Sequence, residues 1–185
     1  KPLLHWSVDT ALRTPEISSV WVSTDDAAIA KVAEESGAGV VMRPGELSGD
    51  VVMPDLAWLH LITSLVQKGQ NIECVVALQA TSPVRLPSHL SAGINDYKSS
   101  EADSLFSASR VDDICLWKQE DDKILQPINF DPKNRERRQD RDNQYLENGS
   151  FYIFTPRTLA ISKNRFHGNI TCSVVPKWAS FEIDE

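Results

Sequence analysis

The sequence lacks the features that mark membrane, nucleic-acid-binding and zinc-binding proteins. No apolar run approaches the roughly 20 residues that a membrane span needs, and no short apolar stretch follows a basic start as in a signal peptide. The three cysteines, Cys74, Cys115 and Cys172, form no CxxC or CxxH pair, so we expect reduced thiols rather than zinc ligands. The net charge of -7 excludes a general attraction for nucleic acid or an anionic membrane.

The composition is that of one folded domain. With 185 residues, 41% of them hydrophobic and 24% charged, the chain can bury a sizeable core. We see no internal repeat and no low-complexity linker. A soluble intracellular protein is therefore expected, organised as a single domain over residues 1–185.

Apolar runs alternate with helical patterns in the order typical of βαβ units, which predicts a doubly wound α/β fold with a parallel sheet over its first part. Asp25 or Asp26 can cap the second of the expected helices. The expected helices cover residues 3–12, about 27–36, 54–66 and 87–97, and the expected strands cover residues 20–23, 40–42, 75–78, 104–108, 151–154 and 172–175.

Two parts of the chain depart from this regular pattern. Residues 114–128 contain two short, polar, strand-like segments, one on each side of the acidic turn at 120–122. This pattern predicts a projecting hairpin. The chain also starts at Lys1 already on the threshold of a helix, with no strand before it. Since the first strand of a doubly wound nucleotide-binding fold is central and the loop after it holds phosphates, we expect that strand and loop to lie outside the given sequence, in a longer polypeptide.

Polar residues gather at the ends of two apolar strands, which is where a binding site is expected. Gln79-Ala80-Thr81-Ser82-Pro83-Val84-Arg85 follows the apolar residues 75–78, and ligands of open α/β sheets bind outside the carboxyl ends of the strands. Arg137-Arg138-Gln139-Asp140 and Glu147-Asn148-Gly149-Ser150 precede the apolar residues 151–154. A local pocket for an anion is expected there.

These segments occur in the order seen in the cytidylyltransferases that activate nine-carbon acidic sugars, and the chain resembles the N-acylneuraminate cytidylyltransferase family over nearly its whole length. The resemblance rests on five segments: 1–3, 22–25, Arg43-Pro44-Gly45-Glu46-Leu47-Ser48-Gly49-Asp50, 79–85 and 147–152. Each is weak alone, but five in sequence are a specific signal. The resemblance implies a mostly parallel nucleotidyltransferase sheet, with residues 112–147 as an insertion for dimerisation and sugar binding.

The resemblance places Gln79 and Ser82 on the acidic sugar. Without it, the same residues would be a polar strand-to-helix connection in which hydroxyls satisfy backbone amides. Related ketodeoxyoctonate cytidylyltransferases carry an aspartate that binds metal where Thr81 stands, so Thr81 argues against that sugar.

The resemblance also implies roles for Arg138, Gln139, Asn148 and Gly149 in the sugar site. A planar guanidinium suits a carboxylate or phosphate, and Arg138 matches the family's arginine better than its neighbours do. Asn148 would offer a donor and an acceptor to sugar hydroxyls, beside a glycine that lets the backbone approach closely. The alternatives are a solvated charge run for residues 135–142 and a turn asparagine at 148.

The end of the chain resembles the family's Ser-x-Asp-Ile-Asp, whose acids hold Mg²⁺. Asp184 is retained and Glu182 replaces the first aspartate, so we expect Asp184 as a ligand and Glu182 as a second one. Residues 51–54, Val-Val-Met-Pro, stand where the family has small hydroxyl residues that read cytosine, which puts base recognition in doubt. Arg43 is a candidate nucleotide contact, or the partner of a structural ion pair.

The expected reaction is therefore the transfer of CMP from CTP to the anomeric hydroxyl of an acidic sugar, N-acetylneuraminate first, with release of pyrophosphate and Mg²⁺ as cofactor. A sister enzyme for pseudaminic, legionaminic or deaminated neuraminic acid is one alternative, and a non-catalytic assembly or regulatory module is another. The exposed Trp117 of the hairpin and the family resemblance both indicate a homodimer. The expected location is the cytoplasm, or the nucleus in an animal.

Overall fold

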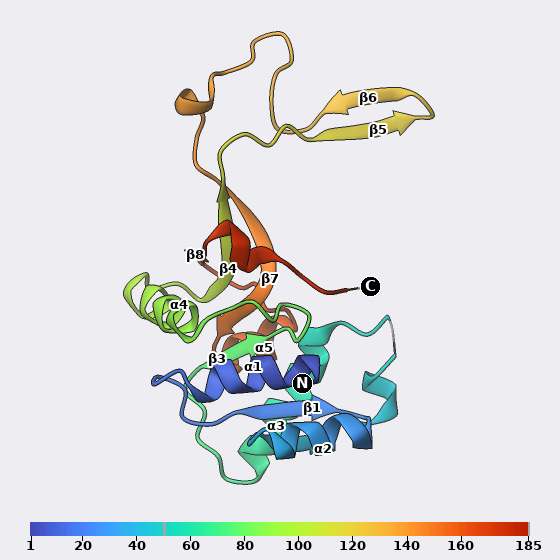
Figure 1. The fold of residues 1–185 in the computed structure, drawn as a ribbon, viewed down its shortest axis with the longest axis vertical. Helices are drawn as coiled ribbons and strands as arrows, with labels where there is room; N and C mark the ends of the chain where they lie inside the picture. Colours follow the sequence, from blue (N-terminus) through green and yellow to red (C-terminus); the bar gives the residue numbers. More distant parts are fainter. Residues whose placement is uncertain (50, 185) are drawn as a thin grey trace.

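The computed structural model describes residues 1–49 and 51–184, with Arg138 described by its backbone alone. Its strands form a four-stranded sheet in the order β3-β7-β4-β8, a separate two-stranded sheet β1-β2, and the hairpin β5-β6 (Figure 1). The strands are β1 (Trp21–Thr24), β2 (Gly39–Met42), β3 (Val75–Leu78), β4 (Ser104–Val111), β5 (Trp117–Asp121), β6 (Ile124–Pro127), β7 (Gln144–Phe154) and β8 (Ile170–Val174).

Five α-helices and three short 3₁₀ helices connect these strands in the described part of the chain. They are α1 (Leu3–Leu12), α2 (Ala27–Glu35), α3 (Pro54–Gln67), α4 (Pro87–Ser99), α5 (Pro156–Ser162), η1 (Gly45–Leu47), η2 (Arg138–Asp140) and η3 (Lys177–Ser180). Asp26 caps α2, since its Oδ1 accepts from the backbone N–H groups of Ala28 and Ile29 at 2.6 and 2.9 Å, as the sequence predicted. No helix among the described residues is long and apolar enough to cross a membrane.

Three of the four strands in the larger sheet, β3, β4 and β8, run in the same direction, as predicted for a mostly parallel sheet. β1 pairs with β2 in parallel and β4 pairs with β8 in parallel, whereas β7 runs antiparallel to both β3 and β4. The predicted sheet is divided, however, because no pairing joins β1 or β2 to the four-stranded sheet among the described residues.

Strand β7 shows why helices cover both faces of the sheet. Successive side chains of a strand point to opposite faces. Phe151 and Ile153 pack with residues of α4 and η3, whereas Tyr152 and Phe154 pack with residues of α3 and α5. The doubly wound arrangement predicted from the sequence is thus formed around β7, and a third cluster packs α1 and α2 onto β1 and β2.

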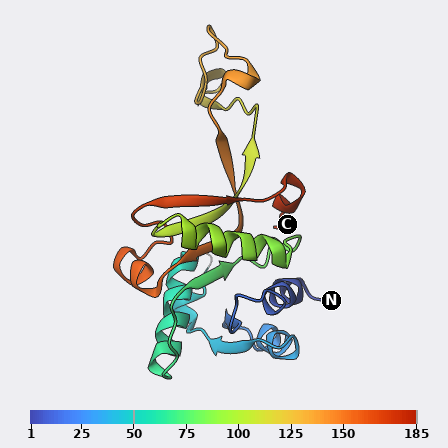
Figure 2. The ribbon, with the colours of Figure 1, turned by 90° about the vertical axis from the view of Figure 1, so that its left-hand side faces the viewer.

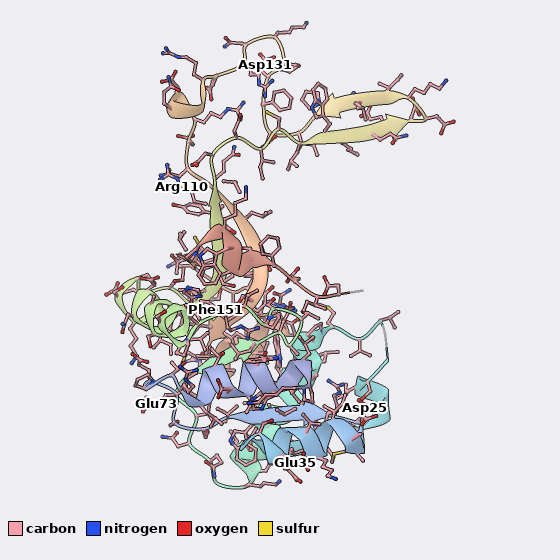
Figure 3. The ribbon with its side chains drawn as sticks, viewed as in Figure 1. Asp25, Glu35, Glu73, Arg110, Asp131 and Phe151 are labelled. Atoms are coloured by element: carbon pink, nitrogen blue, oxygen red, sulfur yellow. The ribbon has the colours of Figure 1, made fainter. Side chains whose placement is uncertain are left out.

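An arm built from residues 112–143 projects from the body of the molecule. It leaves at the ends of β4 and β7, carries β5, β6 and η2, and stands away from the sheets in both views (Figures 1 and 2). Asp131 lies near the end of this arm that is farthest from the body (Figure 3). The projecting hairpin expected from the sequence is therefore present.

Candidate functional site

The loop after β3 is held by a buried arginine. Arg85 is only 3% exposed, and its Nη2 donates to the carbonyl oxygens of Gln79 and Ser82, the second at 2.7 Å. Its Nε donates to Ser150 Oγ at 3.1 Å. Burial lowers the pKa of Arg85 to about 10, so the guanidinium stays charged at neutral pH. Arg85 therefore fixes the backbone that carries two of the predicted sugar contacts.

A bulge in β7 brings Gly149 to this loop. The pairing of β4 with β7 shifts register between Phe106 and Ala108, which leaves residues 148–151 of β7 without regular partners on β4. Gly149 adopts the left-handed region with φ +63°, and a Cβ at this position would collide with Oε1 of Glu182 and Oε1 of Gln79. The positive φ favours glycine here, and an added Cβ would push the ends of these two flexible side chains out of their present positions.

Glu182 joins the same cluster from the C-terminal segment. Ser82 Oγ donates to Glu182 Oε1 at 3.3 Å, and the backbone N–H of Ile183 donates to the carbonyl of Thr81 at 2.8 Å. The predicted residues Gln79, Ser82, Gly149 and Glu182 thus meet at the carboxyl end of β3. The partly exposed amide of Gln79 and the exposed carboxylate of Glu182 can bind the hydroxyls of a polar ligand. Ser82 is only 1% exposed and its hydroxyl is bonded to Glu182, so a direct contact of Ser82 with a sugar stays a prediction.

Asn148 lies next to this cluster, but its amide is occupied within the protein. Its Oδ1 accepts from Ser107 Oγ at 2.6 Å, and its Nδ2 donates to Ser180 Oγ at 3.0 Å. Ser180 Oγ in turn is 2.5 Å from Ser109 Oγ. In this structure Asn148 ties β4 to η3 and fixes the bulge, and a direct contact with a sugar stays a prediction.

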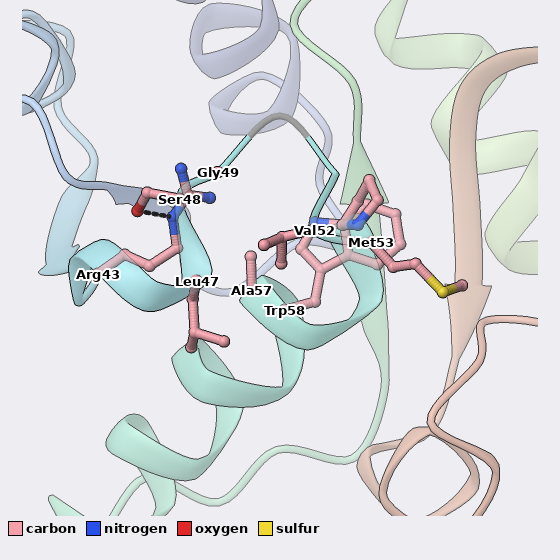
Figure 4. A pocket seen from close by; sticks show the side chains of 9 residues that line it. Arg43, Leu47, Ser48, Gly49, Val52, Met53, Ala57 and Trp58 are labelled. Carbon is pink, nitrogen blue, oxygen red and sulfur yellow. Dashed lines mark hydrogen bonds between the residues drawn. The ribbon is translucent and has the colours of Figure 1, made fainter.

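Arg43 lies at the end of β2, beside a separate pocket of about 180 Å³ (Figure 4). Its Nη2 forms an ion pair with Asp25 Oδ1 at 3.2 Å, and its Nε donates to Ser48 Oγ at 3.0 Å. Both roles considered for Arg43, an ion pair and a ligand contact, are compatible with this position. The pocket is lined by Arg43, Leu47, Ser48, Gly49, Val52, Met53, Pro54, Ala57 and Trp58.

The structure does not bring the predicted contacts of the arm to this cluster. Gln139 is exposed in η2, on the projecting arm (Figure 1). The side chain of Arg138 lies outside the described residues, so its role stays a prediction. In one copy of the chain, the two halves of the predicted sugar site therefore stand apart.

The model of the family described as cytidylyltransferase matches residues 1–166. An N-acylneuraminate cytidylyltransferase of Oncorhynchus mykiss is 37% identical over 185 residues, which cover 98% of this chain and 39% of the relative. N-acylneuraminate cytidylyltransferase A of Danio rerio is 36% identical over 155 residues, or 82% of this chain and 35% of the relative. The chain belongs to the cytidylyltransferase family.

Solved structures support the fold of this chain. A 4-diphosphocytidyl-2C-methyl-D-erythritol synthase has a TM-score of 0.72 at 12% identity, covering 100% of this chain and 84% of the other. A CMP:2-keto-3-deoxy-manno-octonic acid synthetase complexed with CTP has a TM-score of 0.62 at 15% identity, covering 88% and 67%. These likenesses concern the fold alone. The chain spans about two fifths of the length of the curated relatives.

Glu182 and Asp184 fit a partial site for Mg²⁺. Mg²⁺ is commonly held by one or two carboxylates together with substrate phosphates and water. No cluster of three or more potential ligand side chains occurs among the described residues. Binding of Mg²⁺ by Glu182 and Asp184 stays a prediction.

Sequence reasoning gave no role to Arg85, Ser107, Ser150 or Ser180, the residues that support the site. A pattern in the sequence could have indicated the role of Ser107. It stands two residues from Ser109 in strand β4, so the two hydroxyls are expected on the same face of the sheet. For Arg85 the sequence shows only a basic residue in a polar connection. Nothing in the local pattern predicts its burial.

Proposed function

We propose that this cytidylyltransferase acts on a nine-carbon acidic sugar, as an N-acylneuraminate cytidylyltransferase. The observation that carries the proposal is the convergence of Gln79, Ser82 and Glu182 on the backbone of Gly149 at the carboxyl end of β3. The names of the relatives and the resemblance of the motifs support the same substrate class.

In the proposed reaction the anomeric hydroxyl of the sugar attacks the α-phosphorus of CTP. A new oxygen–phosphorus bond forms, the bond from the α-phosphorus to the bridging oxygen breaks, and pyrophosphate leaves, while the proton of the attacking hydroxyl passes to water. The reaction needs no covalent enzyme intermediate, so the protein acts by positioning its substrates and by compensating charge. Gln79 and Ser82 would orient the sugar, and Arg43 would contact the nucleotide.

Mg²⁺ is proposed as the cofactor, held by Asp184 and Glu182. When bound, it supplies positive charge that neutralises the phosphate oxygens. Because Glu182 also accepts a hydrogen bond from Ser82, its carboxylate would join the metal side of the site to the sugar side.

We also propose that the protein works as a homodimer in which the arm of one copy completes the site of the other. Gln139, and Arg138 as the family resemblance implies, would then contact the sugar across the interface. Support comes from the hairpin, whose large apolar side chains include Trp117, Ile124 and Leu125, all about half exposed in the single chain.

The test is pyrophosphate release by the protein encoded by the complete gene, with CTP and Mg²⁺. We expect release that depends on N-acetylneuraminate and is absent without sugar. Release with only pseudaminic, legionaminic or deaminated neuraminic acid would keep the chemistry and change the substrate. No release with any of these sugars, from protein shown to be folded by circular dichroism, would contradict the proposal in favour of a non-catalytic module.

A further inference from the structure

Arg85 is a buried cation with no counter-charge among the residues that the structure describes. Its three bonding partners are the two carbonyl oxygens of Gln79 and Ser82 and the hydroxyl of Ser150, all of them neutral. Its Nη1 is buried and has no hydrogen-bond partner in the described part of the chain. A charge removed from water without an opposite charge is destabilising, so its retention calls for a functional reason.

A second arginine, Arg165, is partly buried and shows the contrast. Arg165 forms an ion pair with Asp55 at 2.8 Å, and its guanidinium lies over the rings of Trp58 and Tyr152, at 4.6 and 4.4 Å from their centroids. The charge of Arg165 is compensated within the fold. That of Arg85 is not, although Arg85 is the more deeply buried of the two.

Arg85 lies next to the residues of the candidate site and bonds to the backbone that carries them. Its guanidinium binds the backbone of Gln79 and Ser82, the residues whose side chains reach Gly149 and Glu182. The third bond, to Ser150, links the loop to the bulge of β7. The planar guanidinium of an arginine forms a fork of several N–H donors and can bind these three oxygens at once. The ammonium group of a lysine cannot reproduce that geometry.

We infer that Arg85 is a positioning residue for the acidic sugar: it fixes the loop of Gln79 and Ser82 against the bulge and supplies the positive charge that favours an anionic substrate there. This inference rests on the proposed function. It deepens that function by naming the residue that selects an acidic over a neutral sugar. Arg85 acts by fixing the position of the loop and by the electrostatic field of its own positive charge, and it does not contact the reacting atoms.

The test compares the KM for the sugar with the KM for CTP in Arg85→Lys and Arg85→Gln variants of the complete protein. We expect the sugar KM to rise about tenfold or more in Arg85→Gln, and several-fold in Arg85→Lys, because lysine keeps the charge but loses the fork. The CTP KM should change by less than about twofold. Arg165→Lys is the matched control, and it should lower stability while leaving the sugar KM unchanged.

Chemical rescue separates this role from a merely structural one. In Arg85→Gly, added guanidinium chloride at low millimolar concentration should lower the sugar KM, whereas sodium chloride at equal ionic strength should not. An unchanged sugar KM in folded Arg85→Lys and Arg85→Gln would overturn the inference. So would an equal rise in the CTP KM, or an equal effect of Arg165→Lys. If the wild-type protein transfers no CMP to any acidic sugar, the proposed function fails first, and the inference fails with it.

Discussion

At the scale of single residues, the ion pair between Asp55 and Arg165 shows how a buried charge is compensated within the fold. Asp55 is 1% exposed, and it accepts from the backbone N–H of Arg165 at 2.6 Å as well as from its guanidinium. This pair joins the start of α3 to the loop that follows α5. It stabilises the fold away from the cluster of Gln79, Gly149 and Glu182.

Asp55→Ala should therefore be strongly destabilising, because it leaves the mostly buried guanidinium of Arg165 without its partner. We expect a loss of about 3 kcal/mol in the free energy of unfolding, measured by urea denaturation. Asp9→Ala is the control, since it removes an exposed i,i+4 pair with Arg13 and should cost below about 0.5 kcal/mol. Similar losses in the two variants would show that burial of the Asp55 pair adds nothing.

The sequence identified the side chains that meet at the site better than those that support it. Gln79, Ser82 and Glu182 were predicted from the resemblance, and the structure brings them together. The contact of Asn148 with the sugar stays a prediction, and its amide bonds to Ser107 and Ser180, which are distant in sequence. Arg85 was missed, because burial and the choice of carbonyl partners are decided by tertiary packing.

At the scale of elements, periodicity predicted the apolar cores of strands but not their full lengths. Residues 151–154 were predicted as a strand, whereas β7 begins at Gln144, because its polar first half pairs with the second half of β4. Helix α5 was not predicted. Its signal is local, since Thr155 accepts from the backbone N–H of Thr158 and Pro156 occupies the first turn.

The bulge of β7 gives a prediction at this scale through Gly149→Ala. Alanine at φ +63° is strained by about 1 kcal/mol, and its Cβ would displace the side chains of Gln79 and Glu182. We expect kcat/KM to fall more than about tenfold while Tm falls by only a few degrees.

Gly69→Ala is the matched control for this variant. Gly69 also has a positive φ, +82°, but an added Cβ there would meet nothing within 4 Å. It should therefore show the same strain in Tm with full activity. Equal losses of activity in both variants would mean that Gly149 matters only for backbone conformation.

At the scale of the whole molecule, the sequence predicted a doubly wound, mostly parallel sheet with a projecting hairpin, and both are confirmed. It did not predict that β1 and β2 would form a sheet of their own, because the pairing of strands distant in sequence is not encoded in local patterns. The arm is the feature with the largest consequence, since it carries Gln139 away from the loop of Gln79 (Figure 1).

This separation leads to a prediction about assembly. If arms pack against a second copy, a charge placed on the hairpin should dissociate the dimer, because Leu125 would be buried in the interface. In sedimentation velocity we expect the wild-type protein to sediment as a dimer and Leu125→Glu as a monomer. The variant should also lose most of its activity, and Ile161→Glu, an equally exposed site on α5, should alter neither property. A monomeric wild-type protein with full activity would refute the shared site, and would require Gln139 to reach the loop of Gln79 within a single chain.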